Sequence, residues 1–227
     1  MKHCRCKRIM ALLLALVLSA GMAPCAFAED YSLESYSDVK RNAWYVPGVR
    51  YCLEHGLMTG YGSYIKLFAP DSPVTRAQVA TILWRLEGAP VTGLSMHYTD
   101  VPEGVWYEDA ARWALSADMM GGTAATTFSP DDPITREQLA AILWRYAQYL
   151  NGGYMPVVSD ASYWNFRDSD KVSAYAAEAM EWAYALGIIT GQRDQTGEDL
   201  LVPWGTSSRA VTATILMRFC LDMGIDG

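Results

Sequence analysis

The chain has 227 residues, of which 51% are apolar and 19% are charged, and its formal net charge is −7. A chain of this length can bury a sizeable core. Its negative charge excludes the broad basic surface with which proteins bind nucleic acid or anionic lipid, so any anionic ligand has to be bound by a few placed arginines.

Residues 1–28 have the pattern of a secretory signal peptide. Basic residues precede an apolar run at 10–18, and Ala-Phe-Ala at 26–28 is a small-x-small cleavage signal. The run is too short to span a bilayer as a stable anchor. Cleavage before Glu29 leaves 199 residues with 14 basic and 25 acidic side chains, a net charge of −11. We therefore expect an exported protein with no membrane anchor after cleavage.

The rest of the chain repeats itself three times, with a period of about 60 residues. Val-Thr-Arg-Ala-Gln at 74–78 returns as Ile-Thr-Arg-Glu-Gln at 134–138 and, less clearly, as Ser-Ser-Arg-Ala-Val at 207–211. Repeats of this length indicate small subdomains that define the architecture. The predicted repeats are residues 31–92, 93–155 and 160–223.

Each repeat begins with an aspartate that is followed, six or seven residues later, by aromatic side chains. A first helix is expected next. A glycine after its apolar run predicts where the helix ends, because glycine adopts the left-handed backbone of a helix C-cap without strain. In chain order these residues are Asp38, Trp44, Tyr45 and Gly60; Asp100, Trp106, Tyr107 and Gly122; and Asp168, Tyr175 and Gly191.

A proline five residues before the repeated Thr-Arg or Ser-Arg leads into a second helix. Thr75 with Gln78, and Thr135 with Gln138, have the spacing of a capping box. Apolar residues then recur at helical spacing and predict a face buried against other helices. These faces are Val79, Ile82, Leu83 and Leu86; Leu139, Ile142, Leu143 and Tyr146; and Thr212, Ile215, Leu216 and Phe219.

The predicted fold is mainly α, with three helix-loop-helix repeats. Three similar amphipathic units cannot each bury their apolar faces alone, so we expect them to pack about a pseudo-threefold axis into one compact body. Cys52 and Cys220 lie in the first and last repeats. In an exported protein they either form a disulfide that closes the molecule or remain small buried side chains, and the sequence leaves both possibilities open.

These motifs resemble the S-layer homology family, the triplicated module that fixes exported proteins to bacterial cell walls. The resemblance rests on Asp-Val near the start of two repeats, the Trp-Tyr pairs and Gly-Leu-Met-Thr-Gly at 56–60. It rests most on Phe-x-Pro-Asp-x-Pro-[Val/Ile]-Thr-Arg-x-Gln before the second helix. The third repeat departs from this pattern, because Val211 replaces the glutamine and Trp204 stands where the other repeats have aspartate.

The resemblance implies noncovalent attachment to a secondary cell-wall polysaccharide or peptidoglycan-linked polymer, often one with a pyruvylated amino sugar, in grooves between the repeats. It implies a secreted protein at the cell wall. In the family the signature arginine contributes to the grooves, which points to Arg76, Arg136 and, less clearly, Arg209. An arginine fork beside the free amides of a helix N-terminus suits a carboxylate. Alternatively, each arginine pairs with an aspartate and fastens the repeats together.

Further candidates for the polysaccharide site are the residues near the start of each repeat. The aspartates either bind sugar hydroxyls or hold the arginines in place, and the second role is favoured. The aromatic pairs either present ring faces to sugars or belong to the core. These candidates are Asp38, Asp100, Trp44, Trp106, Tyr45 and Tyr107.

Catalysis has little support in the sequence. His55 and His97 lie outside the repeated motif, and the chain has no metal-binding spacing and no nucleophile motif. We expect a protein that is not an enzyme and needs no cofactor or metal. Two alternatives to polysaccharide binding remain: a self-associating structural envelope protein, and a module that binds a protein cargo or partner. An anchor requires Arg76 and Arg136 open to solvent, whereas self-association requires an exposed apolar patch.

Overall fold

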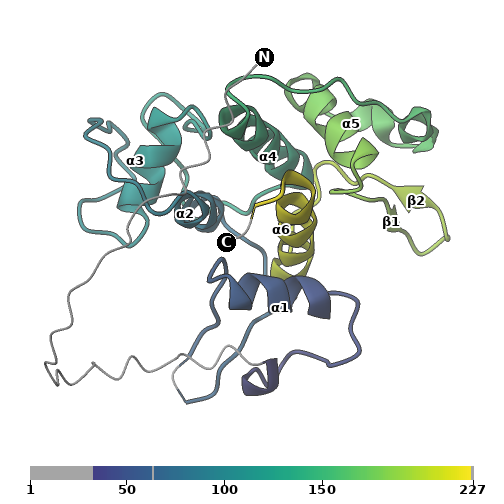
Figure 1. Cartoon of the computed structure of the whole chain (residues 1–227), viewed down its shortest axis with the longest axis horizontal. Coiled ribbons are helices and arrows are strands. Elements are labelled where there is room, and N and C mark those ends of the chain that lie inside the picture. Colours follow the sequence, from purple (N-terminus) through teal and green to yellow (C-terminus); the bar gives the residue numbers. More distant parts are fainter. Residues whose placement is uncertain (1–32, 63, 226–227) are drawn as a thin grey trace, which may run out of the picture. The chain divides into compact units, whose positions relative to one another are not determined.

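The computed structural model describes residues 33–62 and 64–225, so the predicted signal peptide lies outside the described residues. The described chain is mainly helical, as predicted (Figure 1). A two-stranded antiparallel hairpin follows the first helix of the third repeat, and none of the described helices is long and apolar enough to cross a membrane. The main elements are α1 (Val46–Glu54), α2 (Arg76–Leu86), α3 (Glu108–Ser116), α4 (Arg136–Leu150), α5 (Ala177–Ala185), β1 (Gln192–Arg193), β2 (Asp199–Leu200) and α6 (Arg209–Met223).

The second helix of each repeat packs against the first helix of the next repeat. α2 packs against α3, α4 packs against α5, and α6 packs against α1 (Figure 1). The last pair joins the C-terminal repeat to the N-terminal one, so the interfaces form a closed cycle. Eleven of the twelve apolar-face residues predicted for the second helices are buried, and the remaining one, Leu86, packs partly buried against the core. Packing between repeats therefore completes the core of each repeat.

A ring of three backbone hydrogen bonds marks the pseudo-threefold axis. The Val74 amide donates to the Ser207 carbonyl (3.0 Å), the Ser207 amide to the Ile134 carbonyl (2.9 Å), and the Ile134 amide to the Val74 carbonyl (2.8 Å). These residues hold the same position in the three repeats, and all three are fully buried. The ring confirms the predicted arrangement about a pseudo-threefold axis.

The second helices begin as the sequence predicts. Thr75 and Thr135 form complete capping boxes with Gln78 and Gln138, in which each threonine hydroxyl accepts the glutamine amide and each glutamine side chain accepts the threonine amide. Ser208 caps α6 through the Val211 amide alone (3.3 Å), because valine has no acceptor to complete the box.

The predicted ends of the first helices are wrong. α1, α3 and α5 each end six residues before the expected glycine. The backbone turns left-handed at residues directly after these helices, so the expected glycines are not needed as C-caps. The left-handed residues are Gly56 (φ 65°), Asp118 (φ 55°) and Gly187 (φ 69°).

The recurrence of the three glycines instead reflects the close approach of aromatic rings and, at Gly122, of backbone carbonyls. A Cβ atom at Gly60 would lie 2.2 Å from the ring of Tyr36, and one at Gly191 would lie 2.5 Å from the ring of Phe166. A Cβ atom at Gly122 would lie 2.5 Å from the Thr127 carbonyl oxygen. Any larger residue therefore forces the loop away from the aromatic side chain that precedes the repeat's aspartate.

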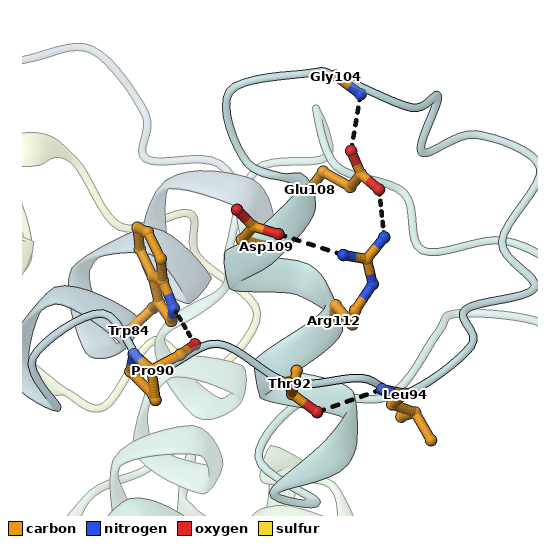
Figure 2. Close-up of polar contacts among 8 residues, drawn as sticks. All are labelled: Trp84, Pro90, Thr92, Leu94, Gly104, Glu108, Asp109 and Arg112. Carbon is orange, nitrogen blue, oxygen red and sulfur yellow. Dashed lines mark hydrogen bonds and ion pairs between the residues drawn. The ribbon is translucent and has the colours of Figure 1, made fainter.

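Polar contacts hold the connection between the first and second repeats (Figure 2). The Trp84 indole nitrogen donates to the Pro90 carbonyl (2.9 Å), which ties the connecting segment to the end of α2. The Leu94 amide donates to the Thr92 hydroxyl oxygen (3.3 Å) further along the segment. Trp84 itself is partly buried and packs against the core.

Acidic residues stabilise the start of α3, which has no side-chain N-cap (Figure 2). Glu108 and Asp109 lie in its first turn, where negative charge opposes the positive end of the helix dipole. The Gly104 amide donates to Glu108 (2.7 Å), and this bond is the main reason that the pKa of Glu108 is lowered. Arg112 pairs with both carboxylates from one turn later.

Cys52 in α1 and Cys220 in α6 are buried free thiols. Burial raises the pKa of Cys220 to about 11 and raises the pKa of Cys52 even further. Of the two possibilities left open by the sequence, the structure therefore has two small buried side chains. Their thiolate populations are negligible at neutral pH, and solvent does not reach them.

The glycine contacts predict unequal effects of two neighbouring substitutions. Gly122→Ala should lower the free energy of unfolding by about 1–3 kcal/mol, because the new methyl group meets backbone carbonyls that cannot rotate away. Gly121→Ala is the matched control, since a Cβ atom there meets nothing within 4 Å. We expect it to change the free energy of unfolding by less than about 1 kcal/mol. Urea unfolding measures both, and equal losses would contradict the close-approach explanation.

The buried thiols predict how residues 29–227 react with a thiol reagent. Without denaturant, Ellman's reagent should release almost no chromophore, because both thiols are inaccessible and protonated. In denaturant without reductant, the same sample should titrate two thiols per chain. Zero thiols in denaturant would show that the chain forms the disulfide instead.

Candidate ligand grooves

The signature arginine at the start of each second helix reaches into the next repeat. Its Nε and Nη2 atoms each donate to a main-chain carbonyl there, and the third arginine returns to the first repeat. The acceptors are Phe128 (2.9 Å) and Gly121 (2.7 Å) for Arg76; Leu201 (2.9 Å) and Thr190 (2.7 Å) for Arg136; and Phe68 (2.6 Å) and Thr59 (2.6 Å) for Arg209. All three arginines therefore fasten neighbouring repeats.

The expectation that Arg76 and Arg136 are open to solvent is wrong. Arg76 is 8% exposed, Arg136 3% and Arg209 4%. Burial, followed by the charge of Arg218, lowers the pKa of Arg136 to about 10. The guanidinium group is still charged at neutral pH, so its hydrogen bonds to carbonyls remain charge-assisted.

The aspartates hold main-chain amides of their own repeats. The two carboxylate oxygens of Asp100 accept the amides of Phe128 (2.8 Å) and Ser129 (2.6 Å). Asp38 and Asp168 hold the matching pairs in the other repeats. The aspartate thus fixes the residue whose carbonyl the arginine binds. The alternative from the sequence had expected a direct pair between arginine and aspartate.

The aspartate carboxylate of each repeat also holds a residue with a strained backbone. Ala69, Ser129 and Val202 have φ values of 56°, 58° and 52°, a region that residues other than glycine seldom occupy. Each donates its amide to the aspartate of its repeat. The two hydrogen bonds per carboxylate offset a backbone cost on the order of 1–3 kcal/mol.

The first amides of the second helices are also engaged by the next repeat. The amides of Arg76 and Ala77 donate to the carbonyls of Asp132 (3.0 Å) and Pro130 (2.9 Å), and the other two repeats have the same pair of bonds. The expectation that these amides are free for an anionic ligand is therefore wrong. The repeated prolines serve instead as acceptors in the contact between repeats.

A groove of about 570 Å³ lies at the second repeat, and side chains from all three repeats line it. Arg76 comes from the first repeat, Gln138 and Arg145 come from α4, and Tyr175 comes from the third repeat. Gly121 and its neighbours in the loop after α3 supply backbone. We call this the second-repeat groove.

One terminal nitrogen of Arg76 faces the second-repeat groove. Nε and Nη2 are engaged by carbonyls, and Nη1 has no protein acceptor among the described residues. No buried side-chain nitrogen or oxygen in that part of the chain lacks a hydrogen bond, so Nη1 is accessible. The Phe128 ring lies against the guanidinium group, with 5.1 Å between the ring centre and the Cζ atom of Arg76. Arg76 therefore fastens two repeats and lines the groove as well.

A smaller groove of about 160 Å³ occupies the matching position at the first repeat. Arg209 replaces Arg76, Gln78 and Arg85 replace Gln138 and Arg145, and Trp106 replaces Tyr175; Tyr61 is a further lining residue. We call this the first-repeat groove.

The sequence analysis missed a second arginine that recurs in each repeat. Arg85, Arg145 and Arg218 each follow the signature arginine by nine residues. Nine residues make two and a half turns at 3.6 residues per turn, so the two arginines leave opposite sides of the helix. The first reaches the next repeat, and Arg85 and Arg145 line the grooves of their own repeats, where Arg145 also donates to the Met119 carbonyl (3.3 Å). The recurrence was visible in the sequence, but the faces had to be assigned to find this role.

The aromatic candidates divide into exposed and buried members. Trp44 and Trp106 are 64% and 63% exposed, whereas Tyr45 and Tyr107 are buried and contact the tryptophans edge-on. The tyrosines belong to the core. Trp106 lines the first-repeat groove.

Tyr175, the matching residue of the third repeat, is held by a carboxylate that the sequence analysis also missed. Its hydroxyl donates to Glu137 (3.0 Å), which is 4% exposed and also accepts the Ser173 amide (2.9 Å). Burial and the charge of Glu137 raise the pKa of Tyr175 to about 12. No cluster of three histidine, cysteine or carboxylate side chains that could hold a metal ion exists among residues 33–62 and 64–225.

The sequence profile of the S-layer homology domain matches three segments, residues 35–80, 97–140 and 165–196. Together they cover more than half of the chain. The chain belongs to the S-layer homology domain family. Each matched segment includes the aspartate, and the first two also include the signature arginine. The family makes this chain a secreted cell-surface protein, and its three repeats are a surface-anchoring module.

Curated relatives carry similar sequence as a part of longer chains. An endoglucanase of Bacillus sp. (strain KSM-635) is 30% identical over 86% of this chain and 20% of its own length. A cellulosome-anchoring protein of Acetivibrio thermocellus is 26% identical over 67% of this chain and 33% of its own. A surface-layer 125 kDa protein of Lysinibacillus sphaericus is 28% identical over 66% and 12%. The chain thus spans a third or less of the length of these relatives.

The fastening contacts predict a specific loss of stability. Arg136→Ala should lower the free energy of unfolding by about 2–4 kcal/mol, because two buried carbonyls lose a charged donor. Arg50→Ala, at an exposed position of α1, is the matched control and should change it by no more than about 0.5 kcal/mol. Urea denaturation followed by circular dichroism measures both. A stable Arg136→Ala chain would show that the repeats are not held together by this residue.

Proposed function

We propose that this module attaches noncovalently to an anionic cell-wall polysaccharide, which it binds in grooves between its repeats. The convergence of the Arg76 and Arg145 guanidinium groups on one groove supports this most strongly. Asp118 also lines this groove, so the two arginines outnumber one carboxylate there, although the chain as a whole has a net charge of −7. Such a pair selects a carboxylate or another compact anion.

The second-repeat groove offers both charged donors and an aromatic surface, which suits a sugar that carries a carboxylate, such as a pyruvyl ketal. Arg76 Nη1 and Arg145 supply charged donors, and Gln138 adds an amide. Tyr175 supplies an aromatic ring, an apolar surface on which a sugar face can pack. The carboxylate then pairs with the arginines while the ring of the sugar lies against the tyrosine.

The other predicted site residues contribute in this proposal mainly by shaping the grooves. Asp38 and Asp100 fix the loops whose carbonyls the arginines bind. Arg136 and Arg209 hold repeats together, and the exposed tryptophans Trp44 and Trp106 extend the apolar surface available to a polymer. We propose no catalytic role for the module, since the relatives that are named as enzymes match it over a small part of their length.

Arg145→Ala tests the proposal more cleanly than Arg76→Ala, which also removes two fastening bonds. We expect Arg145→Ala to weaken binding to purified cell-wall sacculi by about 1–3 kcal/mol, because a charge-assisted hydrogen bond to the polymer is lost. Co-sedimentation of residues 29–227 measures the binding, before and after acid treatment that removes the secondary polymer. Arg50→Ala is the control for removal of an arginine outside the grooves.

Two other results would overturn the proposal. Binding that survives both the acid treatment and Arg145→Ala would identify peptidoglycan or another surface as the target. No binding to sacculi, together with self-association in analytical ultracentrifugation, would favour the structural envelope protein. In either case the grooves would not be polysaccharide sites.

A further inference from the structure

The two grooves differ at a position of the loop after the first helix. In the first repeat Gly60 is followed by Tyr61, and in the second repeat Gly122 is followed by Thr123. Both residues pair with the far side of their loop, through Tyr61 amide to Leu67 carbonyl (2.8 Å) and Thr123 amide to Thr127 carbonyl (2.9 Å). These bonds enclose residues 61–67 in the first repeat and 123–127 in the second, so the first loop is two residues longer and also carries the larger side chain at this position.

Tyr61 covers the arginine of the first-repeat groove. The carbon of the Arg209 guanidinium group lies 4.8 Å from the centre of the Tyr61 ring and 4.7 Å from the centre of the Phe68 ring, so it contacts two aromatic rings. Arg76 contacts only one such ring among the described residues, that of Phe128. In the second-repeat groove the position of Tyr61 is taken by Thr123, which is too small to cover the arginine.

Tyr61 also accepts a hydrogen bond from the side-chain amide of Gln78, which is the amide donor of the first-repeat groove. The Gln78 side-chain nitrogen donates to the Tyr61 hydroxyl (3.1 Å), while its oxygen caps α2. In the second-repeat groove the Gln138 oxygen caps α4 in the same way (3.1 Å), and its nitrogen has no protein acceptor among the described residues. Thus one tyrosine removes two ligand-binding groups at once.

The volumes of the two grooves agree with this difference. The second-repeat groove measures about 570 Å³ and the first-repeat groove about 160 Å³. A pyranose ring with a substituent needs a cavity of the larger kind, since small-molecule sites usually measure about 300–1,000 Å³. The smaller groove does not admit it while Tyr61 stays in place.

The third repeat lacks the same donor for a different reason. Val211 replaces the glutamine, so no side-chain amide is available at this position. Arg218 donates to the Thr190 hydroxyl oxygen (3.4 Å) and Arg145, which it matches, donates to the Met119 carbonyl (3.3 Å), so this arginine does not distinguish the two repeats. Arg136 is the least exposed of the signature arginines, at 3%. The full set of donors is therefore found at the second repeat.

We infer that the module holds one carboxylate-bearing sugar per chain, in the second-repeat groove, and that Tyr61 closes the first-repeat groove by occupying Arg209 and Gln78. This inference rests on the proposed function, because it assigns the ligand of that function to one of the repeated sites. Glu137 acts as a positioning residue, since it holds Tyr175 at the edge of the open groove.

The test exchanges the two residues between the repeats. Residues 29–227 are titrated calorimetrically with a pyruvylated N-acetylhexosamine, and the same sugar without the ketal is the control for the carboxylate. The unchanged chain should bind one sugar. Tyr61→Thr should bind two, because it frees Arg209 and Gln78. Thr123→Tyr should weaken binding at least tenfold, because it places a ring over Arg76.

Tyr61→Phe is the matched control, since it keeps the ring over Arg209 and should leave one sugar per chain. Urea unfolding verifies that each variant is folded, and Tyr61→Thr decides the question alone if Thr123→Tyr does not fold. Two sugars per unchanged chain, or one per Tyr61→Thr chain, overturns the inference and leaves the proposed function standing. An unchanged chain that binds neither this sugar nor sacculi overturns both.

Discussion

The structure depends on one residue in each repeat whose backbone amide and backbone carbonyl are both held by charged side chains. The amide of Phe128 is bound by Asp100 of its own repeat, and the carbonyl of Phe128 is bound by Arg76 of the preceding repeat. The same arrangement occurs at Phe68 and Leu201, and the third copy closes the cycle. Since each repeat supplies an arginine to the next and an acceptor to the one before, no repeat satisfies its own signature arginine. The three repeats should therefore fold as one cooperative unit, unlike an open array in which each repeat depends only on its neighbours.

Arg76 both fastens two repeats and lines the second-repeat groove, so the geometry of the proposed site is fixed when the protein folds. Nε and Nη2 of Arg76 donate to carbonyls, and Nη1 faces the groove. A free surface arginine loses side-chain entropy when it binds an anion, whereas a guanidinium already hydrogen-bonded through Nε and Nη2 has lost that freedom. The same reasoning applies to Tyr175, which Glu137 holds in place. Much of the side-chain entropy that binding would otherwise cost is thus already lost when the protein folds.

The sequence predicted the features that local patterns encode. The capping boxes, the apolar faces and the pseudo-threefold arrangement follow from spacing within one repeat and from the repetition itself. The partners of Arg76 could not be predicted, because main-chain carbonyls are present at every residue and leave no mark in the sequence. The glycines were misassigned for a related reason. A glycine that avoids a contact, such as Gly60 against Tyr36, looks the same in sequence as one that ends a helix.

Comparison of the repeats with one another separates residues that hold the fold from residues that define a ligand site. The aspartate and the signature arginine occur in all three repeats, and their partners are buried backbone groups that every repeat must satisfy. Positions that face a groove differ between repeats: Tyr61 matches Thr123, and Gln138 matches Val211. A change at such a position alters one groove and leaves the cycle of fastening bonds intact. Pseudo-threefold symmetry therefore allows a chain to lose or alter one groove without loss of the fold, which explains how three similar repeats can carry grooves of unequal size.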